Sequence, residues 1–329
     1  MSLIPVTILT GFLGSGKTTL LNHILKADHG YKIAVIENEF GEAGIDNELL
    51  VQARGEQIIE MNNGCICCTV RGDLVRILTE LALKKKVGAL SFDHVVIETT
   101  GLADPAPVAQ TFFVDEAIQA NYLLDAIVTL VDAVHAPQQL DEHHEAQEQV
   151  GFADRVLISK TDLVDAPALT ALRQRLSRIN PRAKVADVHH GVAAVSELLD
   201  IRGFNLNAIL EIEPQFLTDV DHEHDDDVTS FVFREDRPLD LERVEDFLGG
   251  MIQVYGPQMM RYKGVLNIKG ETQRVVFQGV HMLMGSERAG KWQPKEKRSS
   301  KMVFIGRDLP KELLLAGLAG CAVGVAIKA

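Results

Sequence analysis

The segment from Gly11 to Thr19, which reads GFLGSGKTT, constrains the fold of this chain more than any other. It satisfies the spacing G-x-x-x-x-G-K-[ST], follows an apolar β-rich run and precedes a helical pattern. A glycine-rich loop between a strand and a helix turns backbone N–H groups inward, and the positive end of the helix faces the same point. We therefore expect a phosphate-binding loop (P-loop) at one edge of a parallel sheet.

Several side chains near this loop have expected roles. Lys17 is expected to reach the β and γ phosphates, and the Thr18 hydroxyl to ligate Mg²⁺. The run HVVIETTG predicts a strand ending in Glu98, a candidate Mg²⁺ acid where Asp is more usual, and it places Gly101 for a backbone contact with the γ-phosphate. The alternative is that Glu98 only ends a strand. The nucleotide-binding candidates in the loop are Gly11, Gly14, Ser15, Gly16, Lys17, Thr18 and Thr19, and the catalytic candidates are Lys17, Thr18, Glu98 and Gly101.

A second segment is expected to read the base of the nucleotide. RVLISKTD is close to the Asn-Lys-x-Asp pattern of guanine readers, with Ser159 in the place of Asn. Asp162 can accept hydrogen bonds from the N1–H and the exocyclic amine of guanine, whereas adenine leaves the carboxylate unmatched. We therefore predict GTP as the nucleotide, with Ser159, Lys160 and Asp162 on the base side.

Three of the four cysteines lie in NGCICC, at Cys65, Cys67 and Cys68. In a chain of this size, clustered thiols more often bind metal or carry out redox chemistry than form a disulfide framework. C-x-C-C offers at most three thiolates, whereas a closed structural zinc site takes four ligands. Glu37 is a candidate fourth ligand, because it follows a strand and leaves the sheet at the edge of the P-loop. Soft thiolates favour Zn²⁺, Co²⁺, Ni²⁺ or Cu⁺ over Mg²⁺.

Composition excludes several classes of partner. A net charge of -13 over 329 residues argues against an extended nucleic-acid surface, which needs clustered Lys and Arg. The chain begins with an apolar strand pattern instead of a signal peptide, so we expect a cytoplasmic protein. The tail LLLAGLAGCAVGVAI is too short to span a bilayer comfortably and is predicted as a terminal helix, with Cys321 as a buried, inert thiol. We expect neither nucleic acid nor membrane as a partner.

Short apolar strands alternate with amphipathic helices as far as about residue 188. Nearly continuous apolar runs are typical of strands covered on both faces, so we predict an α/β fold with a doubly wound, mostly parallel sheet of the P-loop NTPase type. Beyond it, strands and helices in another order predict a second, smaller α+β domain with an antiparallel sheet. The predicted boundaries are 1–212 for the first domain, 213–227 for an acidic linker that contains histidines, and 228–329 for the second domain. The predicted strands are 5–10, 32–36, 93–98, 125–131, 155–159, 184–188, 230–234, 262–268, 274–284 and 301–305, and the predicted helices are 17–27, 70–85, 137–150, 166–179, 239–254 and one from 310.

The motifs GFLGSGKTT, ENEFGE, NGCICC, ETTGLADP and SKTD, in this order, resemble those of the CobW-type metal-trafficking P-loop GTPases. RYKGVLNI, FQGVH and MVFIG resemble the C-terminal domain of that family, so the resemblance covers nearly the whole chain. It implies a slow GTPase that carries a transition metal or inserts it into a client metalloprotein, but the family serves several metals, so the resemblance does not name the metal. We expect zinc first, with Co²⁺ or another divalent ion as the alternative, and transfer to the client in a nucleotide-dependent way. The expected partners are GTP and GDP, the metal ion and the client, and a second copy of the chain is a further candidate.

The resemblance also implies roles for particular residues. Lys17 and Thr18 would bind nucleotide and Mg²⁺, Glu98 would be the Walker B acid, and Asp162 would read guanine. The implied metal ligands are Cys65, Cys67 and Cys68, with Glu37 as an additional ligand. Two other classes remain open: a regulatory GTPase with a structural zinc site, and a thiol redox protein with a regulatory P-loop, although adjacent cysteines make a strained disulfide.

Overall fold

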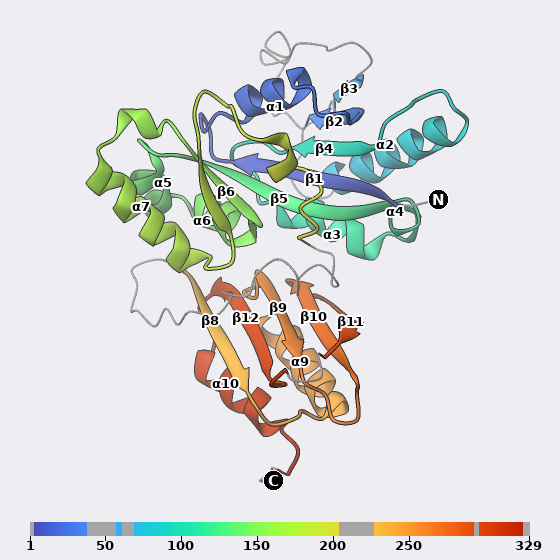
Figure 1. Cartoon of the computed structure of the whole chain (residues 1–329), viewed down its shortest axis with the longest axis vertical. Helices are drawn as coiled ribbons and strands as arrows, with labels where there is room; N and C mark the ends of the chain where they lie inside the picture. Colours follow the sequence, from blue (N-terminus) through green and yellow to red (C-terminus); the bar gives the residue numbers. More distant parts are fainter. Residues whose placement is uncertain (1–2, 38–56, 61–68, 204–226, 293–295, 325–329) are drawn as a thin grey trace. The chain divides into compact units, whose positions relative to one another are not determined.

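The computed structural model describes residues 3–37, 57–60, 69–203, 227–292 and 296–324, and the chain divides into two compact units (Figure 1). Unit 1 comprises residues 1–177 and 182–204, and unit 2 comprises residues 178–181 and 205–329. The predicted metal ligands Cys65, Cys67 and Cys68 lie outside the described residues, as does the predicted linker 213–227 apart from Asp227.

Unit 1 is built on a seven-stranded sheet with the order β3-β2-β4-β1-β5-β6-β7, and every neighbouring pair is parallel. On one side of β1 the chain adds β5, β6 and β7 outward in sequence, and on the other side β2 and β3 precede β4, which returns to lie between β2 and β1. Strands on both sides of a central first strand are typical of a doubly wound α/β sheet. The inner strands are buried along nearly their whole length, because helices cover both faces. The strands are β1 Ile4–Gly11, β2 Ile33–Glu37, β3 Gln57–Glu60, β4 His94–Glu98, β5 Tyr122–Asp132, β6 Arg155–Ser159 and β7 Lys184–Val188.

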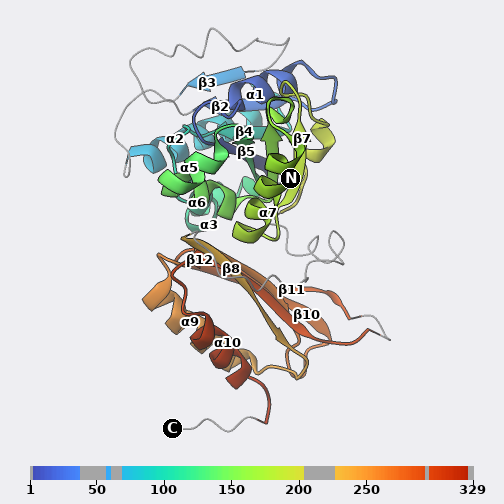
Figure 2. The same cartoon turned by 90° about the vertical axis from the view of Figure 1, so that its left-hand side faces the viewer.

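The helices of unit 1 flank this sheet (Figure 2). Helix α1 packs Leu20 and Ile24 into a core cluster with Leu9 of β1 and Val128 of β5. Helices α2, α3 and α4 pack against one another, and α3, α4 and α6 contact β5. The helices are α1 Lys17–Lys26, α2 Thr69–Lys86, α3 Ala106–Val114, α4 Glu116–Gln119, α5 Ala136–Glu142, α6 His144–Phe152 and α7 Ala166–Ile179, with short 3₁₀ turns at η2 Thr161–Leu163 and η3 Val195–Glu197.

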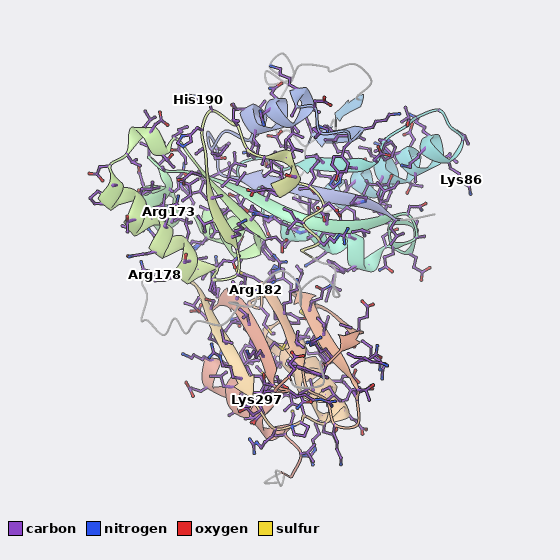
Figure 3. The ribbon with its side chains drawn as sticks, viewed as in Figure 1. Lys86, Arg173, Arg178, Arg182, His190 and Lys297 are labelled. Carbon is purple, nitrogen blue, oxygen red and sulfur yellow. The ribbon has the colours of Figure 1, made fainter. Side chains whose placement is uncertain are left out.

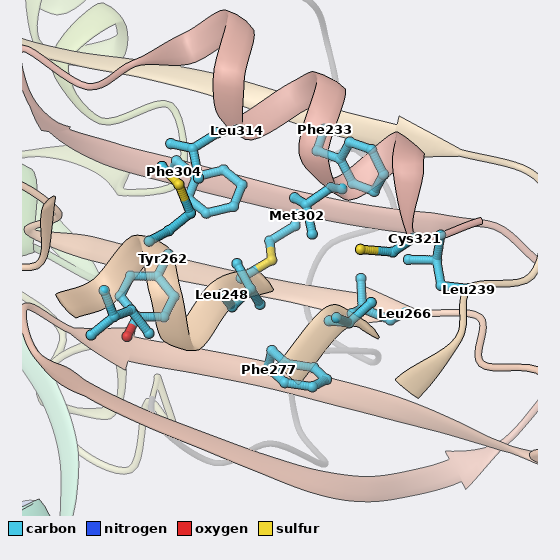
Figure 4. Packing of buried hydrophobic residues seen from close by; sticks show 14 of the residues in the cluster. Phe233, Leu239, Leu248, Tyr262, Leu266, Phe277, Met302, Phe304, Leu314 and Cys321 are labelled. Carbon is cyan, nitrogen blue, oxygen red and sulfur yellow. The ribbon is translucent and has the colours of Figure 1, made fainter. Parts of the chain in front are cut away.

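Unit 2 is the predicted α+β sandwich, with an antiparallel sheet in the order β11-β10-β9-β12-β8. Helices α9 and α10 pack on one face, where Leu248 and Leu314 meet Tyr262, Met302 and Phe304 of the sheet (Figure 4). The elements are β8 Val228–Glu235, α9 Leu241–Tyr255, β9 Arg261–Leu266, β10 Gln273–Val280, β11 Leu283–Lys291, β12 Ser300–Arg307 and α10 Lys311–Gly320. Among the described residues, no helix is both long enough and apolar enough to cross a membrane.

Two predicted elements are each divided in the structure. The predicted helix 137–150 is α5 and α6, separated by His143, which is extended at φ −129° and ψ 113° and places its ring 4.7 Å from that of Phe12. The predicted strand 274–284 is the first part of the hairpin β10–β11, which turns at His281, where φ is 51°. Strand β3 and helices α3 and α4 were not predicted.

Candidate nucleotide and metal site

The P-loop joins β1 to α1 in the predicted position. Gly11, Gly14 and Gly16 have φ of 140°, 73° and 100°, a region in which only glycine is free of strain. A Cβ atom at Gly11 would also overlap the carbonyl of Leu130 on β5. The loop therefore requires these glycines for its conformation and for its close approach to the neighbouring strand.

The Lys17 side chain bonds back to the start of this loop. It is buried, and its Nζ donates to the Gly11 carbonyl at 2.7 Å and to the Phe12 carbonyl at 3.4 Å. Within the described part of the chain, three buried hydroxyls of the nucleotide motifs lack a hydrogen-bond partner, those of Ser15, Thr100 and Thr161. Buried polar atoms are normally paired, so these hydroxyls fit a site whose ligand carries many oxygen and nitrogen atoms.

Glu98 ends β4 directly beside the strand that leads into the P-loop. Leu9 of β1 is in register with Glu98, and the Thr99 hydroxyl donates to that of Thr10 at 2.8 Å. Glu98 and Thr18 are both half-buried. A carboxylate and a hydroxyl are hard oxygen ligands of the type that Mg²⁺ takes together with phosphate oxygens. The two residues thus fit the predicted Mg²⁺ site in their chemistry, and their role there stays a prediction.

Gly101 packs directly on the P-loop. A Cβ atom at Gly101 would lie 2.6 Å from the backbone nitrogen of Leu13 and 2.8 Å from its Cα. From the other side, the buried amide of Gln149 on α6 donates to the carbonyls of Gly101 and Ala103, each at 3.1 Å. The predicted γ-phosphate contact therefore sits in a loop that is fixed from two directions, and Gln149 is a positioning residue that has no motif in the sequence.

The SKTD segment is attached to the P-loop by two consecutive residues. The Ser159 hydroxyl donates to the Ser15 carbonyl at 2.7 Å, and Lys160 Nζ donates to the Gly14 carbonyl at 2.9 Å. Lys160 has a left-handed backbone, with φ of 56°, and it begins the 3₁₀ turn η2, which carries the exposed Asp162. The serine in place of asparagine thus has a defined structural role, since its hydroxyl reaches a P-loop carbonyl.

The loop that follows β7 lies against α1. A Cβ atom at Gly191 would meet backbone atoms of Thr19 at 2.9 Å, and the His23 ring nitrogen Nε2 lies 2.9 Å from the Ala193 carbonyl. His190 is in this loop, exposed and with φ of 50° (Figure 3). The loop is therefore held against α1 through backbone and His23 contacts.

Glu37 is buried, with 5% exposure, at the last position of β2. Its neighbours in register are Glu98 on β4 and Glu60 on β3, so three glutamates occupy one row across three parallel strands. Within the described residues, no group of three or more His, Cys, Asp or Glu side chains is arranged to hold a metal ion. The role of Glu37 as a ligand therefore stays a prediction that involves the cysteines of C-x-C-C.

A parallel α/β sheet with a P-loop, an acidic strand end beside it and a lysine-containing segment attached to it defines a P-loop nucleotide-binding protein. Residues 5–187 match the family described as the CobW/HypB/UreG nucleotide-binding domain, and residues 228–322 match the cobalamin synthesis protein CobW C-terminal domain. The chain belongs to this family, which confirms the resemblance seen in the sequence motifs.

The chain is similar to named members over nearly its whole length. It is 45% identical to the zinc chaperone YjiA of Escherichia coli, over 97% of this chain and 99% of that protein. It is 35% identical to the zinc chaperone CobW of Pseudomonas aeruginosa, over 93% and 88% of the two chains. A crystal structure of Zn(II)-bound YjiA GTPase from E. coli matches with a TM-score of 0.80 and 40% identity, covering 98% of this chain and 99% of that one.

Proposed function

We propose that this protein is a GTPase that binds zinc through its C-x-C-C motif and transfers it to a client metalloprotein under the control of bound nucleotide. Membership of the CobW family supports the nucleotide-binding part of this proposal. The zinc chaperones among its relatives, and the Zn(II)-bound GTPase with the same fold over the full chain, support zinc as the metal, with Co²⁺ as the alternative.

One observation carries the proposed link between nucleotide and metal. Glu37, the candidate metal ligand, is in register with Glu98, the candidate Mg²⁺ ligand, on the neighbouring strand. Adjacent strands lie about 4.8 Å apart and share a ladder of backbone hydrogen bonds. A displacement of the end of β4 on GTP hydrolysis would therefore reach Glu37 through the strand pairing, without a longer path through the protein.

The residues divide into a nucleotide part and a metal part. Gly101 contacts the γ-phosphate through its backbone, and hard oxygen atoms hold Mg²⁺ while soft thiolates hold the transition metal. The assigned residues are Gly11, Gly14, Ser15, Gly16, Lys17, Thr18 and Thr19 for the phosphates, Thr18 and Glu98 for Mg²⁺, Ser159, Lys160 and Asp162 for guanine, and Cys65, Cys67, Cys68 and Glu37 for zinc.

Thermodynamic linkage relates nucleotide binding to metal binding in this arrangement. If GTP raises zinc affinity, zinc raises GTP affinity by the same factor, and couplings between two sites are typically about 5- to 150-fold. Hydrolysis then weakens the metal site, and the ion passes to the client. The proposal includes a cytoplasmic location, domains at 1–212 and 228–329 joined by the acidic segment 213–227, and a second copy of the chain as a candidate partner.

The test is a zinc titration with and without a non-hydrolysable GTP analogue in the presence of Mg²⁺. We expect zinc to bind more tightly by about 5-fold or more when the analogue is bound. Cys67→Ala is expected to weaken zinc binding at least tenfold, because it removes one of three thiolates, while affinity for the Mg²⁺-analogue complex changes little.

Cys321→Ser is the matched control. Cys321 is buried in unit 2, where its thiol donates to the carbonyls of Arg243 and Gly317 and burial raises its pKa, so it does not supply a thiolate. Its replacement should leave zinc affinity unchanged. Equal zinc affinity in both nucleotide states would contradict the transfer proposal and favour a regulatory GTPase with a structural zinc site.

A further inference from the structure

A buried carboxylate outside the recognised motifs lies next to the base-reading segment. Asp132 ends β5 with 1% of its side chain exposed, and it is in register with Ser159 on β6, one residue before Lys160. Its Oδ2 accepts from Lys160 Nζ at 2.6 Å and lies 2.8 Å from His135 Nδ1, and its Oδ1 accepts from the Val134 N–H at 2.9 Å. Burial raises the pKa of Asp132, but these hydrogen bonds outweigh it and hold the pKa below its usual value.

The Lys160 ammonium has a second acceptor that belongs to the P-loop. Its Nζ also donates to the Gly14 carbonyl, so one ammonium joins β5, the base-reading segment and the phosphate loop. The bond to the Gly14 carbonyl is assisted by the charge of the ammonium alone, whereas the bond to the buried Asp132 carboxylate joins two opposite charges and is shorter, 2.6 Å against 2.9 Å. The carboxylate is therefore the acceptor that fixes where the ammonium lies.

We propose that Asp132 is a positioning residue for guanine-nucleotide binding, which acts by holding Lys160 against the P-loop. Asp162, the proposed guanine reader, follows Lys160 by two residues in the same turn. When Lys160 is held, the base-reading turn and the phosphate loop keep one relative position, and a nucleotide that contacts both dissociates slowly. This inference rests on the proposed function, since it assumes that the bound nucleotide is a guanine nucleotide.

The test is a double-mutant cycle on the dissociation rate of a fluorescent GDP, with Asp132→Asn, Lys160→Met and both together. Each single variant should release GDP about 10 to 100 times faster than the wild-type protein, because each removes a charge-assisted hydrogen bond. The double variant should release it no faster than the faster single variant, because both substitutions remove one interaction. Rate increases that multiply in the double variant would overturn the proposal.

Two further variants separate positioning from loss of structure. Asp132→Glu keeps the buried charge and should release GDP at a rate between those of wild type and Asp132→Asn. His135→Ala removes the other side chain at the same Oδ2, but His135 is 59% exposed and water can replace it, so the rate should change by less than about twofold. A rate as fast in His135→Ala as in Asp132→Asn would overturn the proposal. If Asp132→Asn is unfolded by circular dichroism, the Asp132→Glu and Lys160→Met pair completes the cycle.

Selectivity for GDP over ADP distinguishes this inference from the proposed function. A wild-type protein without guanine preference would refute the proposed function itself. A selective wild-type protein with an unchanged rate in Asp132→Asn would refute only the role of Asp132. Asp162→Asn provides the reference, since it should relax the guanine preference, whereas Asp132→Asn should accelerate release and retain that preference.

Discussion

His94, Thr7 and Asp125 form a buried hydrogen-bonded line across β4, β1 and β5, away from the P-loop. Thr7 Oγ1 lies 2.8 Å from His94 Nε2 and donates to Asp125 Oδ2 at 3.3 Å, while Asp125 also accepts from the backbone N–H groups of Ile201 and Arg202. Burial lowers the pKa of His94 to about 4, and burial raises the pKa of Asp125 to about 6. One imidazole and one carboxyl group therefore have their pKa values shifted in opposite directions within the same core.

These shifts predict opposite effects of pH on the free energy of unfolding. The carboxyl of Asp125 binds its proton more tightly when folded, so its contribution is present at low pH and is lost as pH rises through about 6. His94 is held neutral when folded, so its contribution is present above its ordinary pKa and is lost as pH falls toward about 4. Between these values the two slopes, each about 1 kcal/mol per pH unit, oppose each other.

We therefore expect the two single variants to tilt the pH profile in opposite directions. From pH 4.5 to 6, His94→Gln should lose stability relative to the wild-type protein as pH rises, and Asp125→Asn should gain it. Urea unfolding at several pH values measures both differences, and the comparison with wild type removes the contribution of other carboxylates. Profiles parallel to that of the wild-type protein would show that these groups do not titrate as the buried geometry requires.

Single residues were predictable from the sequence where a motif fixes their chemistry. The P-loop glycines have the backbone conformation that their spacing indicates, and Lys17 and Ser159 contact carbonyls of the P-loop, while the nucleotide-binding roles of these residues stay predictions. Asp132 and Gln149 were not predicted, since each acts on a segment that is distant in sequence and brought close only by the sheet. Buried polar residues of this kind become recognisable only when their tertiary partners are known.

At the level of elements, the loop after β4 is held between α6 and the P-loop. Gln149 fixes it from one side, and Gly101 lies against the Leu13 backbone on the other. A side chain at position 101 could not be accommodated without a shift of the Leu13 backbone, because the interior is closely packed. The loop and the P-loop are therefore expected to move together.

Gly101→Ala tests this contact. We expect GTP hydrolysis to fall at least tenfold, because the added Cβ would lie 2.6 Å from Leu13 N and would displace the proposed contact with the γ-phosphate, while GDP affinity changes by less than about threefold. Gly72→Ala on α2 is the control, since nothing lies within 4 Å of its Cβ position and alanine favours a helix by about 0.5 to 1 kcal/mol. Normal single-turnover hydrolysis in Gly101→Ala would refute the assigned role.

Helices and strands with a strong apolar periodicity were predictable from the sequence. The points at which they break were not. The apolar spacing of Leu140, Ala146 and Val150 continues through His143, so the sequence predicts one helix where the structure has two. The His143 ring lies on Phe12, a contact between segments far apart in sequence that no local pattern contains. The hairpin of β10 and β11 was missed for a similar reason. Its two turn residues, His281 and Met282, lie within an apolar run, and neither is a glycine or a proline that would indicate a turn.

At the level of the whole molecule, the described nucleotide motifs all lie in unit 1, and unit 2 has its own core. In unit 2, Gly317 of α10 approaches α9 so closely that a Cβ atom would overlap the Phe247 ring. The order of helices and strands in both units can be predicted from the hydrophobic pattern of the sequence. A close contact between two helices cannot, because it depends on tertiary packing. This division predicts that damage to the second core spares nucleotide binding.

Gly317→Ala is therefore expected to lower the free energy of unfolding by about 1 to 3 kcal/mol through overpacking of the core of unit 2. GDP affinity should stay within about twofold of the wild-type value. The control is Gly320→Ala in the same helix, where nothing lies within 4 Å of the added atom, and which should not be destabilising. Denaturant unfolding and equilibrium GDP binding measure the two effects, and a large loss of GDP affinity in Gly317→Ala would contradict the division.

The row of Glu60, Glu37 and Glu98 has a consequence for how the chain can change its length. Side chains alternate between the two faces of a strand. Inserting or deleting one residue in β2 would therefore turn Glu37 to the opposite face of the sheet from the one it has in register with Glu98. Two inserted residues would restore the face but displace the carboxylate by about 6.6 Å along the strand. Insertions and deletions within β2 are therefore incompatible with keeping Glu37 beside Glu98. Natural or engineered variants that retain this pair must accommodate length changes outside the strand.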